Sequence, residues 1–339
     1  MSLMSIPPGM KIAAQVSPEA SDEDLQFVKQ MGLDWAVCWT DGEHAGYDYY
    51  ARTKDRFEKA GVRIYGFGNR EVHNQDAIVL GLENRDAKIE EYVDHLRALG
   101  KAGIPYTTYA HMGNGIWSTD RESTRGGASA RGFDLAKADA GHWAGRYYHL
   151  PLTHGRTYSE DEIWENFQYF VAQAAPVAEE EGVRIGIHPD DPPQPELGGI
   201  PRCIFSSFDG YHRAMEIADS PNVGICFCIG CWLEGGDLMG RGVEDSLQEF
   251  GKANKLFKIH FRNVDQPLPH FVETFVDDGY FDMYKAMRVL EQTGFDGVLI
   301  PDHIPMMADD ARIGTAYTIG YMKALLARAQ EEVKGQVRA

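Results

Sequence analysis

The sequence predicts a single (β/α)8 TIM barrel with long βα loops, because short apolar segments alternate with helical segments eight times along its 339 residues. Glycines such as Gly61 and Gly182 stand between a helical segment and the next strand, where a left-handed residue closes the helix. Three longer segments, residues 113–158, 189–201 and 265–280, follow predicted strands, on the side where such barrels build their sites. No glycine-rich phosphate loop follows the first strand, which weakens the alternative of an open doubly wound sheet.

The strands and helices can be assigned in order from their patterns. Eight segments have strand character: residues 11–16, 34–39, 62–67, 104–110, 183–188, 223–228, 256–261 and 297–300. Ser21 and Ser159 begin capping boxes, since an acidic residue follows each of them three positions later. Periodic helical segments lie between or after the strands: residues 84–100, 162–181, 282–293 and 313–329. We therefore expect residues 4–339 to form one domain and residues 1–3 to be an expression remnant.

Composition restricts the partners and the compartment. The chain is 43% hydrophobic, enough for one large core, and its net charge of −18 argues against a nucleic-acid partner, which needs a basic face. An anionic small substrate is compatible with this charge, because a metal ion can invert the local field inside a cleft. Five cysteines, and the lack of an apolar run of roughly 18 residues, favour a cytoplasmic protein without a membrane partner.

Four predicted strands in the C-terminal half end on a side chain that can bind a metal ion: His188, Cys228, His260 and Asp302. In a parallel barrel these ends lie on one rim, with neighbouring strands about 4.8 Å apart. Side-chain alternation supports this arrangement, because His260 shares the inward face with Lys258, while Phe257 and Ile259 face the surrounding helices. Two imidazoles, a thiolate and a carboxylate on one rim predict a divalent metal site.

Each of these residues also has a simpler interpretation. His188 and His260 could be hydrogen-bonded core histidines, and Asp302 could form a salt bridge. Cys228 lies in a Cys-x-Cys-x-x-Cys cluster that could be half of a structural zinc site, but no second Cys or His pair lies at finger spacing. Cys226, the first member of this cluster, is interpreted as a small core residue.

Other residues near the predicted rim are candidates for catalysis and substrate binding. His303 directly follows Asp302 and is a candidate general acid or base, although it could also be a surface histidine at a helix start. Arg262 shares a face with His260 and could bind a carboxylate. Three further residues follow the predicted third and fourth strands and could line the pocket: Asn69, His111 and Trp117.

Several segments resemble the D-mannonate dehydratase family, whose members are metal-dependent TIM barrels of the xylose-isomerase-like class. The most specific one is Ile-His-Pro-Asp-Asp-Pro-Pro at residues 187–193. Others follow in the family's order: residues 227–230, 259–262, 278–284, 301–303 and 316–320. The resemblance covers most of residues 160–325.

The resemblance implies an activity and roles for individual residues. The family dehydrates D-mannonate to 2-keto-3-deoxy-D-gluconate, and a homodimer is expected. By this resemblance, Mn²⁺ or Fe²⁺ binds to four residues: His188, Cys228, His260 and Asp302. His303, Tyr317 and Asp302 then form the catalytic group, in which His303 and Tyr317 transfer protons. Arg262 is expected to contact the sugar acid.

The chain departs from the family pattern at two positions that bear on specificity. Val272 stands where the family has a histidine, and Ile300 stands where it has an arginine. An arginine replaced by isoleucine loses a charge and up to five donors, so dehydration of a sugar acid is the expectation and D-mannonate its leading substrate. Two alternatives stay open. The thiolate of Cys228 argues against a sugar isomerase or epimerase, and the two departures favour a catalytically inactive, sugar-acid-binding paralogue.

Overall fold

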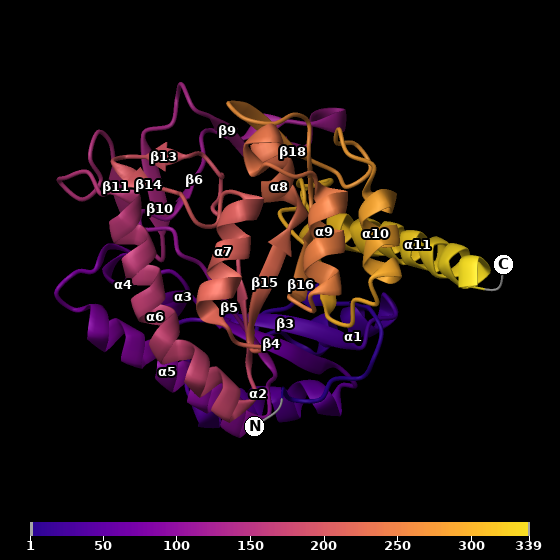
Figure 1. Ribbon diagram of the computed structural model, residues 1–339. Helices are drawn as coiled ribbons and strands as arrows, with labels where there is room; N and C mark the ends of the chain where they lie inside the picture. Colours follow the sequence, from indigo (N-terminus) through magenta and orange to yellow (C-terminus); the bar gives the residue numbers. More distant parts are fainter. Residues whose placement is uncertain (1–2, 338–339) are drawn as a thin grey trace.

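The computed structural model describes residues 3–337, and a curled parallel sheet forms its centre (Figure 1). Six strands pair in the order β1 (Lys11–Ile12), β19 (Val298–Pro301), β16 (Leu256–Phe261), β15 (Val223–Cys228), β12 (Arg184–Ile187) and β5 (Tyr106–Tyr109). Three more pair in the order β2 (Ala14–Gln15), β3 (Trp35–Thr40) and β4 (Arg63–Asn69). Only Ala13 separates β1 from β2, so the second sheet continues the first. Two of the residues interpreted as an expression remnant, 1 and 2, and the last two residues of the predicted domain, 338 and 339, lie outside the described residues.

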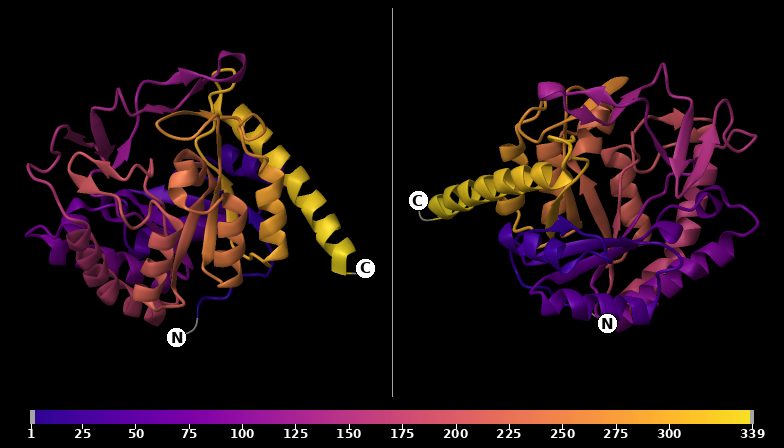
Figure 2. Two further views of the ribbon diagram at one scale, coloured as in Figure 1. Left: turned by 45° about the horizontal axis from the view of Figure 1, so that its top comes forward. Right: turned by 180° about the vertical axis from the view of Figure 1, so that it is seen from behind.

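Helices follow the strands and cover the outer face of the curled sheet (Figure 2). The longer ones are α1 (Asp22–Gln30), α2 (Tyr47–Lys59), α5 (Arg85–Ala102), α6 (Glu160–Glu181), α7 (Phe208–Ala218), α9 (Val243–Lys252), α10 (Met283–Gln292) and α11 (Ala311–Val337). The shorter ones are α3 (Arg70–His73), α4 (Asp76–Leu80) and α8 (Ile229–Gly235), with 3-10 helices η1 (Arg125–Gly127) and η2 (Gly236–Met239). The predicted capping boxes are confirmed, since Ser21 and Ser159 each exchange hydrogen bonds with the acidic residue three positions on.

The three long predicted loops contain small antiparallel sheets. One consists of β6 (Ile116–Trp117), β10 (Ala140–Trp143) and β11 (Arg146–His149), and another of β17 (Asn263–Val264), β18 (His270–Thr274) and β9 (Gly132–Asp134). Two hairpins are β7 (Glu122–Ser123) with β8 (Ser129–Ala130), and β13 (Glu196–Leu197) with β14 (Ile200–Pro201). Because β9 pairs with β18, the loops after β5 and β16 form one structure, at the end toward which β15 points (Figure 1).

Two apolar layers stabilise the sheet. The larger one lies between the sheet and the helices and includes Ile185, Ile225 and Ile259. A smaller cluster fills the inside of the curl: Ala13, Val37, Tyr65, Tyr106, Phe257, Val298 and Ile300. The prediction that Phe257 faces the helices is wrong, because the register between β15 and β16 shifts between Ile225 and Cys226. The extra, unpaired residue interrupts the alternation at this point, so Phe257 joins the inner cluster while Ile259 keeps its predicted side.

Two structural features relate to the predicted cytoplasmic location: the state of the cysteines and the character of the helices. All five cysteines are free thiols, and three of them, Cys226, Cys228 and Cys231, lie in β15 and α8. Over residues 3–337, no helix combines the length and apolar character needed to cross a membrane.

Candidate active site

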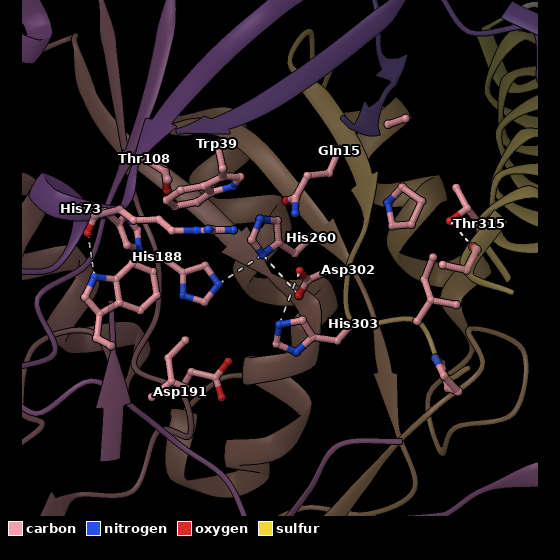
Figure 3. Close-up of a pocket in the computed structure, with 18 of the residues that line it drawn as sticks. Gln15, Trp39, His73, Thr108, His188, Asp191, His260, Asp302, His303 and Thr315 are labelled. Atoms are coloured by element: carbon pink, nitrogen blue, oxygen red, sulfur yellow. Dashed lines mark hydrogen bonds and ion pairs between the residues drawn. The ribbon is translucent and has the colours of Figure 1, made fainter. Parts of the chain in front are cut away.

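The four predicted metal ligands lie at the carboxyl ends of β12, β15, β16 and β19, where Cys228 groups with His188 and also with His260 and Asp302. Figure 3 shows three of them, His188, His260 and Asp302, beside one another. His188 Nε2 lies 3.2 Å from His260 Nδ1, which lies 3.5 Å from an oxygen of Asp302. Cys228 Sγ lies 3.9 Å from the same carboxylate oxygen. Ligand atoms around one tetrahedral ion with bonds of about 2.0–2.3 Å stand roughly 3.3–3.8 Å apart, so the spacing and the donor chemistry fit a divalent metal.

Neighbouring groups orient the two histidines. His188 Nδ1 donates to the carbonyl oxygen of Pro189 at 2.7 Å, which leaves Nε2 directed to the cluster. His260 Nε2 lies 3.5 Å from Cys226 Sγ, which leaves Nδ1 directed to Asp302. Metal-binding histidines usually engage their second nitrogen in this way. Cys226 therefore contacts a candidate ligand, a role that the interpretation as a core residue missed.

Electrostatics favours anionic forms of Cys228 and Asp302. Burial raises the pKa of the Cys228 thiol, but a hydrogen bond from Cys231 and the charge of Arg262 outweigh it and hold that pKa well below its ordinary value. Burial also raises the pKa of Asp302, and the charge of His260 outweighs it, so that this pKa is lowered too. A thiolate and a carboxylate facing two imidazoles form a donor set that attracts a divalent cation.

Cys231 lies close enough to compete with Cys228 as the sulfur ligand. Its Sγ groups with His188 and Cys228, and separately with Asp191 and Glu234. Burial and the neighbouring Cys228 raise the pKa of the Cys231 thiol well above its ordinary value, which keeps it protonated. The second of these groups surrounds a guanidinium nitrogen, which lies 3.1 Å from Cys231 Sγ and already supplies a positive charge. Cys228 is therefore the better candidate.

That guanidinium belongs to Arg262, which is 1% exposed and lies in a buried network of charges. Arg262 donates to Glu234 and to Glu273, each at 2.8 Å. Arg131 pairs with Asp191 at 2.6 Å and with Glu273 at 2.9 Å. The network joins β16 to three of the loop segments. Arg262, predicted to contact the substrate, pairs through its two terminal nitrogens with these buried carboxylates and does not line the cavity described below.

His303 connects this network to the metal-ligand cluster, which consists of the four candidate ligands His188, Cys228, His260 and Asp302. Its Nδ1 lies 2.7 Å from a carboxylate oxygen of Glu273 and also contacts Arg262. Burial lowers the pKa of His303, but Asp302 and Glu273 outweigh burial and raise it. The backbone of His303 has a φ of 42°, in the left-handed region that favours glycine, and such strain clusters at functional sites. This places a titratable imidazole directly beside the candidate ligand Asp302.

A cavity of about 480 Å³ opens above the cluster, lined by His188, His260, Asp302 and His303 among others. An aromatic wall that the sequence analysis did not identify lines another part of it. His73 stands 4.8 Å from the ring of Trp39 and 4.9 Å from the ring of Trp143, measured between centroids. Trp143 comes from β10 in the long loop after β5, so no local pattern points to it.

Besides Arg262, three residues predicted to line the substrate pocket do not line the cavity: Asn69, His111 and Trp117. Asn69 caps α3 instead, because its side-chain oxygen accepts the backbone N–H of Glu71 at 3.0 Å. The next residue, Arg70, lines the cavity in its place. His111 is buried against Tyr109, and Trp117 is buried with its indole N–H directed to Asn114: the distances are 2.8 Å for His111 and 3.2 Å for Trp117.

Tyr317 also lies outside the cavity. It sits on the exposed side of α11, where its hydroxyl donates to Asp277 at 2.7 Å and accepts from Arg125 at 3.4 Å. Thr315, one half-turn earlier on the same helix, does line the cavity. The structure therefore brings His303 and Asp302 together and leaves Tyr317, the third member of the predicted catalytic group, apart from them.

The two departures from the family pattern are also away from the cavity. Ile300 is completely buried in the inner apolar cluster. Val272 lies in β18, where its backbone N–H donates to Asp265 at 2.7 Å. In this chain neither side chain lines the cavity.

Comparison with known proteins agrees with the resemblance noted in the sequence. Residues 22–144 and 148–336 match the family model for D-mannonate dehydratase (UxuA). The chain belongs to the D-mannonate dehydratase family. A mannonate dehydratase of Enterococcus faecalis is 32% identical over 279 residues, which cover 74% of this chain and 75% of that one.

Solved structures support this family membership and the fold. The crystal structure of mannonate dehydratase from Streptococcus suis serotype 2 superposes with a TM-score of 0.82 at 25% identity and covers 96% of both chains. A xylose isomerase domain protein from Planctomyces limnophilus superposes with a TM-score of 0.60 at 13% identity, over 96% of this chain and 99% of that one. The second likeness concerns the fold alone. The resemblance to the dehydratase family that the sequence indicated is confirmed.

Proposed function

We propose that this protein is a hydro-lyase that dehydrates D-mannonate to 2-keto-3-deoxy-D-gluconate and water. Family membership supports the reaction, and the observation that carries the proposal is the meeting of His188, Cys228, His260 and Asp302 at one rim beneath a cavity of about 480 Å³. A cavity of that size is sufficient for a six-carbon acid. The alternatives, a sugar isomerase or an inactive paralogue, have no comparable support.

The four ligand residues are proposed to hold one divalent metal, with Mn²⁺ or Fe²⁺ the expected ions. Nitrogen, sulfur and oxygen donors together suit first-row divalent ions, and cellular supply decides among them. When bound, such an ion supplies a fixed positive charge that stabilises the negative charge developing beside the substrate carboxylate as the proton leaves.

His303 is proposed to transfer a proton during the reaction. With Nδ1 engaged by Glu273, the other ring nitrogen, Nε2, is the atom left to exchange a proton with the substrate. The reaction removes the proton from C2, next to the carboxylate, and protonates the departing C3 hydroxyl, which leaves as water. The resulting enol becomes the 2-keto-3-deoxy acid. The proposal omits Tyr317, because its hydroxyl is held by Asp277 on the outer side of α11.

The finer structural expectations are also part of this proposal. We propose that the strands close into a (β/α)8 barrel in one domain over residues 4–339. A side chain built on Gly66 of β4 would lie 2.8 Å from the carbonyl oxygen of Tyr106 of β5, which supports these two strands as neighbours. A cytoplasmic location is proposed from the five free thiols, and a homodimer from the family resemblance.

Turnover of a panel of sugar acids tests the proposed activity. Protein of verified Mn²⁺ content is incubated with D-mannonate and with other C5 and C6 aldonates, and 2-keto-3-deoxy products are measured. Release of 2-keto-3-deoxy-D-gluconate from D-mannonate is expected. If only a different acid gave a 2-keto-3-deoxy product, that acid would be the substrate in place of D-mannonate. If the product were an epimer of the acid supplied, the reaction would be epimerisation and not dehydration.

A further inference from the structure

Arg70 differs from the other arginines of the site in its position and in its lack of a partner. It is the one lysine or arginine that lines the cavity among the described residues, and its side chain is exposed there. In the part of the chain that the structure describes, no hydrogen bond or ion pair engages its guanidinium, in contrast to Arg262 and Arg131. An unpaired guanidinium inside a cavity is available to an anionic ligand.

The charge of the cavity favours such a group. The thiolate of Cys228 and the carboxylate of Asp302 together carry two negative charges, which a bound divalent ion only neutralises. A sugar acid then adds a negative charge that the metal centre does not balance. Asp191, the other carboxylate of the wall, is already paired with Arg131 and Arg262. Arg70 is therefore the permanent cation that remains to balance the substrate.

His73 adds a second binding group beside Arg70. The two residues are three positions apart on α3, so they lie on one face of this short helix, and both line the cavity. His73 is 5% exposed, and its Nδ1 has no hydrogen-bond partner among the described residues. Burial lowers the pKa of His73 to about 3, so the ring stays neutral. A buried nitrogen without a partner is costly unless a ligand satisfies it.

Neighbouring residues fix the position of Arg70 and His73, and they favour the main cavity over a second cavity as the place where Arg70 binds an anion. The indole N–H of Trp143 donates to the carbonyl oxygen of Arg70 at 2.9 Å and fixes the start of α3. A neighbouring cavity of about 430 Å³ also reaches Arg70, but the carboxylates of Glu19 and Asp41 line it. Those charges repel an anion there, so the main cavity is the favoured side. Figure 3 shows His73 beyond His188, on the side away from Asp302.

We propose that Arg70 and His73 form the subsite that holds the carboxylate end of the sugar acid. The guanidinium of Arg70 pairs with the carboxylate, and Nδ1 of His73 forms a hydrogen bond with a neighbouring hydroxyl. This places C2 and C3 between α3 and the metal-ligand cluster. The assignment rests on the proposed function, since it takes a sugar acid as the ligand, and it makes Arg70 the residue that selects acids over neutral polyols.

Substitution of Arg70 tests the subsite with a matched control. In Mn²⁺-loaded protein, Arg70→Met is expected to weaken D-mannonate binding by about 10- to 100-fold, with Arg70→Lys in between, because a charge-assisted hydrogen bond is lost. Arg52→Met removes the same charge from the exposed side of α2 and is expected to leave binding unchanged. D-mannitol has no carboxylate, so its affinity as a competitor of D-mannonate should change less than twofold in Arg70→Met. The metal content of the variant should be unaffected.

His73→Phe separates the two parts of the subsite. It keeps an aromatic ring against Trp39 and Trp143 but removes the free nitrogen. Weaker binding of both D-mannonate and D-mannitol is expected, by several-fold. Equal D-mannonate affinity in Arg70→Met and wild type would overturn the assignment. If wild type neither binds nor converts D-mannonate, the proposed function fails first, and the same comparison with whichever sugar acid binds decides on Arg70; binding of none would overturn both.

Discussion

Replacing Cys228 by serine separates metal binding from folding. Cys228 is completely buried at the end of β15, and its Sγ accepts the backbone N–H of Cys231 at 3.4 Å, which caps the first turn of α8. Serine is a preferred helix cap and its hydroxyl can accept the same N–H. The volume change is small, so the free energy of unfolding of the metal-free protein should fall by no more than about 1 kcal/mol.

Metal affinity should respond much more strongly. A serine hydroxyl is not ionised at neutral pH and is a poor ligand for a first-row divalent ion, so one of four donors is lost. Loss of a group that merely orients a ligand already costs about 10- to 100-fold in affinity. Loss of the ligand itself should therefore weaken Mn²⁺ binding by at least about 100-fold.

Metal content after dialysis and the denaturant midpoint of the metal-free protein provide the two readouts. Cys203→Ser, at the half-buried cysteine that belongs to none of the candidate ligand groups among the described residues, serves as the control and should keep its metal. Full metal content in Cys228→Ser would refute the assignment. If Cys231→Ser lost the metal instead, Cys231 would be the sulfur ligand.

Two further predictions concern proton transfer and pH. His303→Asn should lower kcat on D-mannonate by about 100- to 10,000-fold with a small change in KM, measured under saturating substrate; an unchanged kcat would exclude His303 from the chemistry. Burial lowers the pKa of His260, but Asp302 and Cys226 raise it well above its ordinary value. Because only the neutral imidazole binds a metal, Mn²⁺ affinity should fall as pH decreases through that raised pKa, beginning at a higher pH than for an exposed histidine. Titration calorimetry across pH would show this, and pH-independent affinity would contradict it.

The positions of the four candidate metal ligands on the fold could be predicted because their placement depends on local patterns. Each of these four residues lies within one position of the carboxyl end of a short apolar strand, and parallel strands bring such ends to one rim. Alternation along β16 correctly set the side of His260. It failed at Phe257, because a register shift with β15 depends on pairing with another strand and leaves no signal within β16 itself.

The substrate-facing wall could not be predicted, since it depends on distant segments. Asn69 and Arg70 are adjacent, but the side chain of Asn69 accepts the backbone N–H of Glu71 and caps the helix, while Arg70 lines the cavity. Trp143 reaches His73 through a hairpin in the loop after β5, whose position is set by pairing with β6. Long-range pairing of this kind has no counterpart in sequence spacing.

The buried charges behind the cavity show the same limit. Asp191, Glu234 and Glu273 come from three different loops or helices and meet at Arg262. Aspartate, glutamate and arginine are usually found at the surface, so the sequence gives no sign that these residues are buried. Only the tertiary fold brings them together as pairs. The sequence pattern suggested a substrate contact for Arg262 because strand alternation directs it inward. Alternation does not reveal that four carboxylates, those of Asp191, Glu234, Glu273 and Asp302, already lie around it.

Chelation and restoration of activity on D-mannonate test the central claim most directly. Protein with a verified content of one divalent ion per chain is assayed for release of 2-keto-3-deoxy-D-gluconate, then treated with a chelator and assayed again before and after Mn²⁺ or Fe²⁺ is returned. If the metal-ligand cluster holds a catalytic metal, turnover should disappear on chelation and return when the metal is restored. Equal turnover by the metal-free protein, or no turnover by the loaded protein on D-mannonate or any other C5 or C6 aldonate, would contradict it.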